Sequence, residues 1–184
     1  MSFKFRDLTA DEIECRVQSL IITDKTKGAI LLLYKNARAD MTILDETVGA
    51  LNWQRRHARE NANCIVSVWD EDKGQWVEKE NTGTESFSDA EKGIASDSFK
   101  RACTNWGIGR ELYTAPFIWV PLVAKDGAEN FDVFEKNGKF QTKTEFVVTF
   151  VKIKNKKIVG INIENPKKKR TVFAWGDLTP DEEM

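Results

Sequence analysis

The stretch SDAEKGIASDSFKRACTNWG, residues 88–107, decides the fold. Ser88 and Glu91 have the spacing of a capping box, in which a serine and a glutamate three residues later satisfy the first free backbone N–H groups of a helix. Apolar residues then recur every three or four positions, and the final glycine can take the left-handed conformation that ends a helix. The stretch therefore predicts a helix with one buried face and with Lys100 and Arg101 on the side away from it.

Three strand-length segments precede this helix, at residues 51–58, 63–69 and 75–81. An acidic turn that ends in glycine joins the last two. Val66 and Val68 alternate with polar or larger neighbours, which is typical of an antiparallel sheet covered on one side. The order of these segments predicts three strands followed by the helix.

The rest of the chain predicts elements of both kinds. Residues 9–19 begin with a threonine cap and two acids, which favours a short helix, and residues 38–50 have helical periodicity that ends at a glycine. Strands are expected at residues 28–34, 117–120, 146–153, 157–163 and 172–175, with a long loop at residues 124–144.

We therefore expect an α+β fold with an antiparallel sheet, a β-β-β-α core, one long helix packed on the sheet and a C-terminal β-hairpin. The expected domain organisation is a core domain at residues 1–120 and a hairpin extension of the same domain at residues 121–176. The acidic residues 177–184 are expected to form a disordered tail.

The composition excludes several classes of protein. Hydrophobic residues make up 41% and charged residues 31% of the chain, which is typical of a globular fold. No apolar run approaches the ~20 residues that cross a bilayer. Three dispersed cysteines and one histidine predict neither a disulfide framework nor a metal site, and they favour a reducing cytoplasm.

The charges are segregated along the chain although the formal net charge is only -1. Residues 61–92 carry eight acids against three lysines, whereas residues 151–170 carry eight bases against one acid. Arg55, Arg56 and Arg59 form a short basic cluster before the acidic segment. A basic face on a neutral protein is one interpretation of this pattern, and solvated loops and strand edges are the other.

Enzymatic interpretations have little support in the sequence. A magnesium nuclease could use the acidic residues Asp70, Asp72, Glu78, Glu80 and Glu85, but acidic turns are common in proteins without a metal. His57 has no nucleophile beside it in the sequence. Residues 107–109, Gly-Ile-Gly, lack the lysine and serine of a phosphate-binding loop.

Three segments carry a resemblance to a known family. Residues 45–53, DETVGALNW, are followed by EKGIASDSFKRA at residues 91–102 and NWGIGRELY at residues 105–113. The order and spacing of these motifs resemble the phage single-strand annealing proteins of the Rad-fifty-two-like superfamily, known as Sak-type recombination proteins. The resemblance covers roughly residues 38–120, and its most specific part is K-R-A followed by G-I-G-R-x-L-Y.

The resemblance implies a β-β-β-α core that assembles into rings or helical filaments. Single-stranded DNA would lie with its backbone in a positive groove, with no cofactor, no metal and no covalent catalysis. Lys100 and Arg101 match the basic pair of the family, and Arg38 lies next to a position where eukaryotic relatives carry a DNA-contacting arginine. The basic residues of the chain add further candidate DNA contacts: Arg55, Arg56, Lys92, Lys152 and Lys154.

The leading hypothesis is thus a protein that binds and anneals single-stranded DNA, independently of ATP, in phage or prophage recombination and repair. Its expected partners are single-stranded DNA, further copies of itself, and a phage exonuclease or single-strand binding protein in the cytoplasm of a bacterial host. The alternatives are a non-catalytic interaction module of a recombination complex and a metal-dependent nuclease. Salt-dependent binding of short single strands and magnesium-dependent cleavage distinguish these hypotheses.

Overall fold

A computed structural model describes residues 3–84 and 90–180 of the chain. The chain divides into two compact units. Unit 1 is formed by Met1–Leu8 and Lys35–Arg110, and unit 2 by Thr9–Tyr34 and Glu111–Met184. Helices and mostly antiparallel strands occur in the one chain, so the expected α+β class is confirmed.

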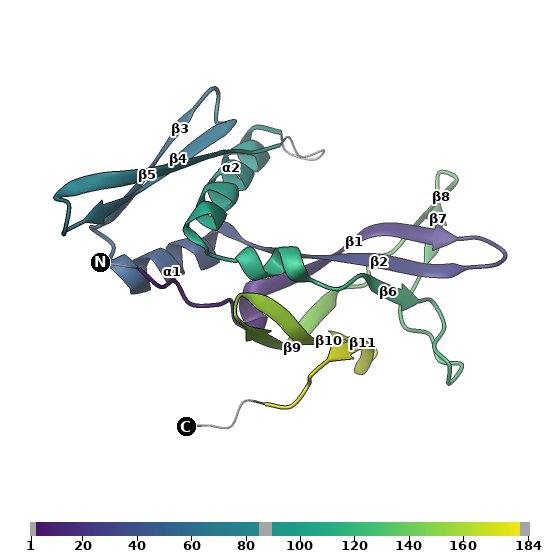
Figure 1. Ribbon diagram of the computed structural model, residues 1–184. Helices are drawn as coiled ribbons and strands as arrows, with labels where there is room; N and C mark the ends of the chain where they lie inside the picture. Colours follow the sequence, from purple (N-terminus) through teal and green to yellow (C-terminus); the bar gives the residue numbers. More distant parts are fainter. Residues whose placement is uncertain (1–2, 85–89, 181–184) are drawn as a thin grey trace. The chain divides into compact units, whose positions relative to one another are not determined.

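Unit 1 contains a three-stranded antiparallel sheet in which β4 (Asn63–Asp70) is the middle strand (Figure 1). Its elements in chain order are α1 (Ala37–Val48), β3 (Trp53–Ala58), β4 (Asn63–Asp70), β5 (Gln75–Thr82) and α2 (Ala90–Trp106). β4 pairs with β3 on one side and β5 on the other, so that Val68 lies between Trp53 and Val77. The three predicted strands and the helix that follows them are therefore present in this order.

The core of unit 1 lies between β4 and α2. Alternate residues of β4 meet the apolar stripe of α2, and the indole N–H of Trp106 donates to the Val66 carbonyl at 3.1 Å. The fully buried members of this core are Cys64, Val66, Val68, Phe99, Ala102 and Cys103. Because the apolar stripe of α2 faces β4, Lys100 and Arg101 lie outside the face that packs on the sheet.

The exit of α2 explains the most specific motif of the sequence. Gly107 has a φ of +99° and ends the helix, and Gly109 has a φ of +68°. Between them Ile108 is fully buried. The guanidinium of Arg110 donates to the carbonyls of Thr104 and Asn105 at 2.9 and 3.2 Å, where a cation also complements the helix dipole.

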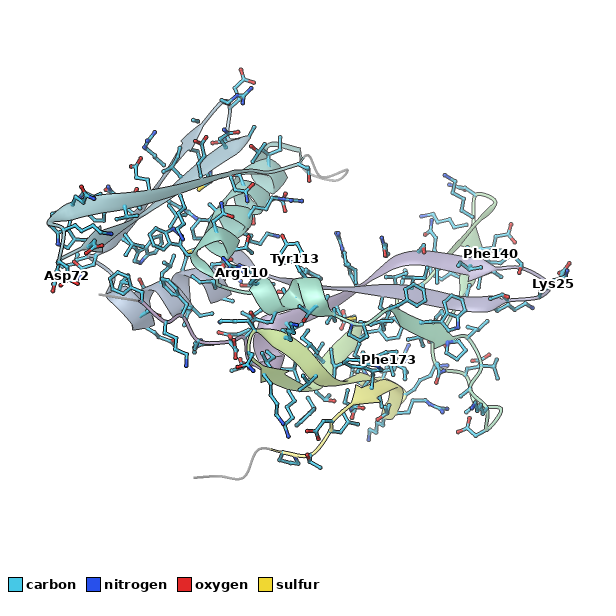
Figure 2. The ribbon with its side chains drawn as sticks, in the orientation of Figure 1. Lys25, Asp72, Arg110, Tyr113, Phe140 and Phe173 are labelled. Carbon is cyan, nitrogen blue, oxygen red and sulfur yellow. The ribbon has the colours of Figure 1, made fainter. Side chains whose placement is uncertain are left out.

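Unit 2 is built on a six-stranded sheet with the strand order β11-β10-β9-β1-β2-β6. Its elements are η1 (Ala10–Glu12), β1 (Ile13–Ile22), β2 (Lys27–Lys35), η2 (Arg110–Thr114), β6 (Ile118–Pro121), β7 (Phe134–Lys136), β8 (Lys139–Gln141), β9 (Phe146–Lys154), β10 (Lys157–Asn165) and β11 (Arg170–Gly176). Two of them, β2 and η2, begin or end with one residue of unit 1. Lys25 lies at the tip of the long β1–β2 hairpin (Figure 2). β9 and β10 form the expected C-terminal hairpin, and β11 is the expected edge strand.

Two sequence expectations were wrong. Thr9 caps only the single turn η1, and the helix expected at residues 9–19 is replaced by strand β1. The hydrogen bonds and packing that these residues gain from neighbouring strands stabilise a strand more than the cap at Thr9 stabilises a helix. The loop expected at residues 124–144 contains the hairpin β7–β8, whose Asn137 and Gly138 both have positive φ, as a tight hairpin turn requires.

Some expectations lie beyond what the structure describes. Ser88 of the expected capping box is outside the described residues, and so are the side chain of Glu91 and residues 181–184 of the expected tail. The domain boundaries at residues 120 and 176 remain a prediction. Within the described part of the chain, no helix is both long enough and apolar enough to cross a membrane.

Candidate nucleic-acid interface

Lys100 and Arg101 lie on the side of α2 away from its packed face. Lys100 is half-buried, and no carboxylate among the described side chains lies within ion-pair distance of it. The Arg101 side chain is 41% exposed, and its Nε lies 2.8 Å from Oδ2 of Asp97, one turn earlier. The helix therefore offers one lysine and one arginine that is already bound to an acid.

Asp97 is held as a carboxylate by two partners. Burial raises the pKa of Asp97, but the Thr84 backbone N–H and the Arg101 guanidinium outweigh burial and hold the pKa below its usual value. The Thr84 N–H donates to Oδ2 at 2.9 Å. Asp97 is consequently ionised at neutral pH and offsets part of the positive charge of this helix face.

Asp97→Asn should raise the affinity for single-stranded DNA. The substitution removes one negative charge from the helix face, breaks the ion pair of Asp97 with Arg101, and keeps an oxygen that can accept from the Thr84 N–H. The slope of log K against log salt should steepen by up to about 0.7, the value of one phosphate contact on a single strand. Fluorescence anisotropy of a labelled oligonucleotide at several salt concentrations measures both quantities.

Asp24→Asn provides the matched control, because Asp24 is an exposed acid of the β1–β2 turn in unit 2 and carries the same charge. An equal gain in both variants would assign the effect to net charge rather than to Arg101. No gain in Asp97→Asn would contradict a phosphate contact at Arg101.

Arg55 and Arg56 point to opposite faces of the sheet, as neighbours in a strand must. Arg55 lies on the α2 face, with its Cζ 4.6 Å from the centroid of the Phe99 ring, and it remains exposed. Arg56 lies on the other face, where its Nη2 is 3.2 Å from Oε2 of Glu78. Of the two arginines, only Arg55 shares a face with α2.

The structure gives less information on the side chains of Arg38 and Lys92. Arg38 is exposed in the first turn of α1, and its backbone N–H donates to the side chain of the capping residue Asn36. Lys92 belongs to the first turns of α2, and its side chain is outside the described residues. Both stay candidate DNA contacts.

Lys152 and Lys154 belong to β9 in unit 2. The Lys152 side chain is 6% exposed, and its Nζ lies 2.9 Å from Oδ2 of Asp177 and 2.8 Å from the Thr179 carbonyl. Lys154 is exposed, with Nζ 3.7 Å from the same carboxylate. Because Lys152 is buried and bound to the C-terminal segment, we leave it out of the interface proposed below.

The acidic residues considered for a nuclease are engaged in other contacts. Glu78 accepts from Arg56 and Ser67, Glu80 accepts from Asn63, and Asp70 pairs with Lys73. Asp72 lies at the tip of the β4–β5 hairpin (Figure 2), and Glu85 is outside the described residues. In the part of the chain that the structure describes, no group of three or more potential metal ligands lies together.

His57 has a hydroxyl neighbour that the sequence did not reveal. The Oγ of Ser98 lies 3.4 Å from Nδ1 of His57, and Ser98 is fully buried. Its hydroxyl also lies within hydrogen-bond distance of the Asn61 and Ala95 carbonyls, at 3.0 and 3.1 Å. Burial, followed by the positive charge of Arg55, lowers the pKa of His57. A buried hydroxyl that shares its proton with carbonyls is a structural contact rather than an exposed nucleophile.

A second contact missed by sequence reasoning is the ion pair between Lys35 and Asp40. Both side chains are buried, at the end of β2 and in the first turn of α1. The only signal in the sequence was an acid at position 40 inside the apolar stripe that continues through Ile43 and Leu44, which are fully buried. Charged residues are rarely buried unless they are paired.

The chain was compared with known proteins. Residues 55–131 match the family model described as Rad52/22 family double-strand break repair protein. Searches of curated proteins and of solved structures give no significant match. The matched region contains most of β3, all of β4, β5 and α2, and the exit motif of α2, and it thus includes Lys100 and Arg101. Residues 55–131 of this chain are therefore similar to the Rad52/22 family, in agreement with the superfamily that the sequence resembles.

Proposed function

We propose that this protein binds single-stranded DNA along the outer side of α2 and anneals complementary strands during DNA recombination and repair. The observation that carries the proposal is the position of Lys100 and Arg101, inside the matched segment and away from the buried stripe of their helix. Cations in this position neutralise phosphates and release counterions, which gives affinity without sequence preference. Arg55 is exposed on the face of the sheet that carries α2, and it is a further candidate contact beside this surface.

The finer parts of the proposal follow from the resemblance to phage annealing proteins. The protein acts without ATP, in a bacterial host that carries a phage or prophage, beside an exonuclease or a single-strand binding protein. Binding through phosphates leaves the bases free to pair with a second strand. The Arg38 side chain and the Lys92 side chain complete the proposed set of contacts.

Annealing of two complementary oligonucleotides should proceed with neither ATP nor magnesium, because binding and pairing require no covalent step. The measurement is the loss of donor fluorescence when labelled strands pair, in buffer with EDTA and with nucleotide omitted. The variant that lacks both cations of α2 is the control for protein-dependent pairing. Annealing by pure protein that starts only on addition of hydrolysable ATP would contradict this assignment.

The working species should be a closed or helical homo-oligomer. One subunit of this size spans only a few nucleotides, and a repeated groove lets several weak phosphate contacts act together. A candidate contact is the β4–β5 hairpin, where the Trp69 and Trp76 rings pack edge to face with centroids 5.5 Å apart and Trp76 is 38% exposed. The basic segments of the chain carry a positive charge that is complementary to the acidic turn of this hairpin.

Light scattering at micromolar concentration, with and without excess single-stranded DNA, tests the oligomer. A monomeric mass in both conditions would exclude it. Charge reversal at both Asp70 and Asp72 should loosen the assembly more than Lys100→Ala does, because it reverses two of the three acidic charges of the turn, which also contains Glu71.

A further inference from the structure

The ion pair between Lys35 and Asp40 lies directly behind the proposed DNA-binding surface. Lys35 is 4% exposed and Asp40 is fully buried, and the Lys35 ammonium contacts Oδ1 of Asp40. The same ammonium lies 3.4 Å from the backbone carbonyl of Lys100. One buried lysine thus connects the first turn of α1 to the turn of α2 that carries Lys100.

The surroundings of Lys35 leave space for this connection. A Cβ atom at Gly109 would lie 2.6 Å from both Cδ and Cε of Lys35, so the glycine at the exit of α2 allows the lysine stem to pass. Lys100 is also close enough to Asp40 for its positive charge to lower the pKa of that carboxyl. The pair is therefore enclosed by the two turns that it joins.

Stability alone is a weak explanation for this pair. Oδ2 of Asp40 is buried and accepts no hydrogen bond from a nitrogen or oxygen donor of the described residues, and the nearby Cys103 thiol is only a weak donor to this carboxyl. Burial raises the pKa of Asp40 to about 6, against the opposing effect of Lys35, which indicates that the carboxylate is not fully compensated. Apolar side chains of similar shape often stabilise a fold as well as a buried ion pair does.

We propose that Lys35 and Asp40 are positioning residues, which hold the Lys100 turn of α2 in the orientation that lets the Lys100 ammonium reach a DNA phosphate. This inference rests on the proposed function. Neither residue contacts DNA itself, because both are buried. A cation whose backbone is held by a buried partner loses less conformational freedom on binding, so its contact contributes more to affinity.

The test uses the full chain with Lys35→Met and Asp40→Leu combined. Leucine has the branching of aspartate, and methionine retains most of the lysine stem without its charge. The thermal midpoint should stay the same or rise, while binding of a labelled single strand weakens two- to thirtyfold. The slope of log K against log salt should fall by about 0.7, as expected for one lost phosphate contact.

The decisive readout is the cost of Lys100→Ala in the two backgrounds. Lys100→Ala should weaken binding clearly in the wild-type chain and much less in the chain that lacks the pair, because Lys100 no longer makes its contact there. Arg101→Ala should cost the same in both, since Asp97 and not the pair holds Arg101. A purely structural pair would leave the cost of Lys100→Ala unchanged, and this result would overturn the proposal.

Asp40→Asn is the second variant if the apolar pair does not fold. It keeps the shape of the side chain and removes its charge, so it should move affinity and slope in the same direction by a smaller amount. Wild-type affinity and slope in a folded Asp40→Asn chain would also overturn the proposal. Failure of the proposed function looks different: Lys100→Ala would then have no effect even in the wild-type chain.

Discussion

Replacing Lys100 and Arg101 together with alanine should weaken single-strand binding at every sequence and leave the fold intact. Each change is expected to alter the free energy of unfolding by no more than about 0.5 kcal/mol, since both side chains are partly exposed and lie outside the apolar stripe of α2. The slope of log K against log salt should flatten by about 1.4 if each cation contributes one phosphate contact on a single strand. Anisotropy titrations between low and moderate salt provide the slope, and thermal melting provides the check on folding.

Lys136→Ala combined with Lys139→Ala is the charge-matched control. Both lysines are exposed on the β7–β8 hairpin in unit 2, so the double substitution removes the same two charges from another place. We expect near wild-type affinity in this control. Unchanged affinity and slope in the Lys100 and Arg101 variant would remove α2 from the DNA-binding surface.

Phe99→Ala should produce the largest loss of stability. The Phe99 side chain is fully buried in unit 1, stacks on Trp53 with ring centroids 6.1 Å apart, and supports the Arg55 guanidinium. Truncation of a buried phenylalanine typically costs about 3–5 kcal/mol, which is a large share of the stability of most domains. Urea denaturation followed by tryptophan fluorescence measures the change, because Trp53 reports on this contact.

Phe140→Ala separates the effect of burial from the effect of losing a phenylalanine. Phe140 is 47% exposed on the β7–β8 hairpin, so its truncation should cost little. Phe99→Leu should lie between the two variants, because it retains much of the buried volume. A Phe99→Ala chain as stable as the Phe140→Ala chain would show that α2 is not packed on the sheet as described.

The sequence predicted a helix or a strand correctly where the residues of that segment alone determine its secondary structure. The apolar stripe of α2 and the alternation at Val66 and Val68 predicted elements that the structure contains. The failure at residues 9–19 has a physical cause, because a good cap at Thr9 stabilises only one turn when the next residues gain more by pairing in a sheet. The pair Asn137 and Gly138 is itself a local signal for a tight hairpin turn.

The candidate site was less accessible to sequence reasoning than the fold. Lys100 and Arg101 could be placed on one side of a helix by periodicity alone. Some of the ion pairs that decide which cations are available join residues far apart in the chain, such as Lys152 and Asp177, 25 positions apart, whereas the pair of Asp97 with Arg101 spans one helical turn. The same limit hid the contact of Lys35 with the carbonyl of Lys100, which only the folded chain brings together.

The contact of Lys152 with Asp177 and Thr179 has a practical consequence for handling the protein. A recombinant version that stops at Gly176 would leave the buried ammonium of Lys152 without its carboxylate and its carbonyl acceptor. Loss of two partners of a buried ammonium is costly, so such a shortened version should express poorly. Purification tags and fluorescent fusions are therefore better joined beyond Thr179 through a flexible linker, and a protease site should be placed no earlier than that residue.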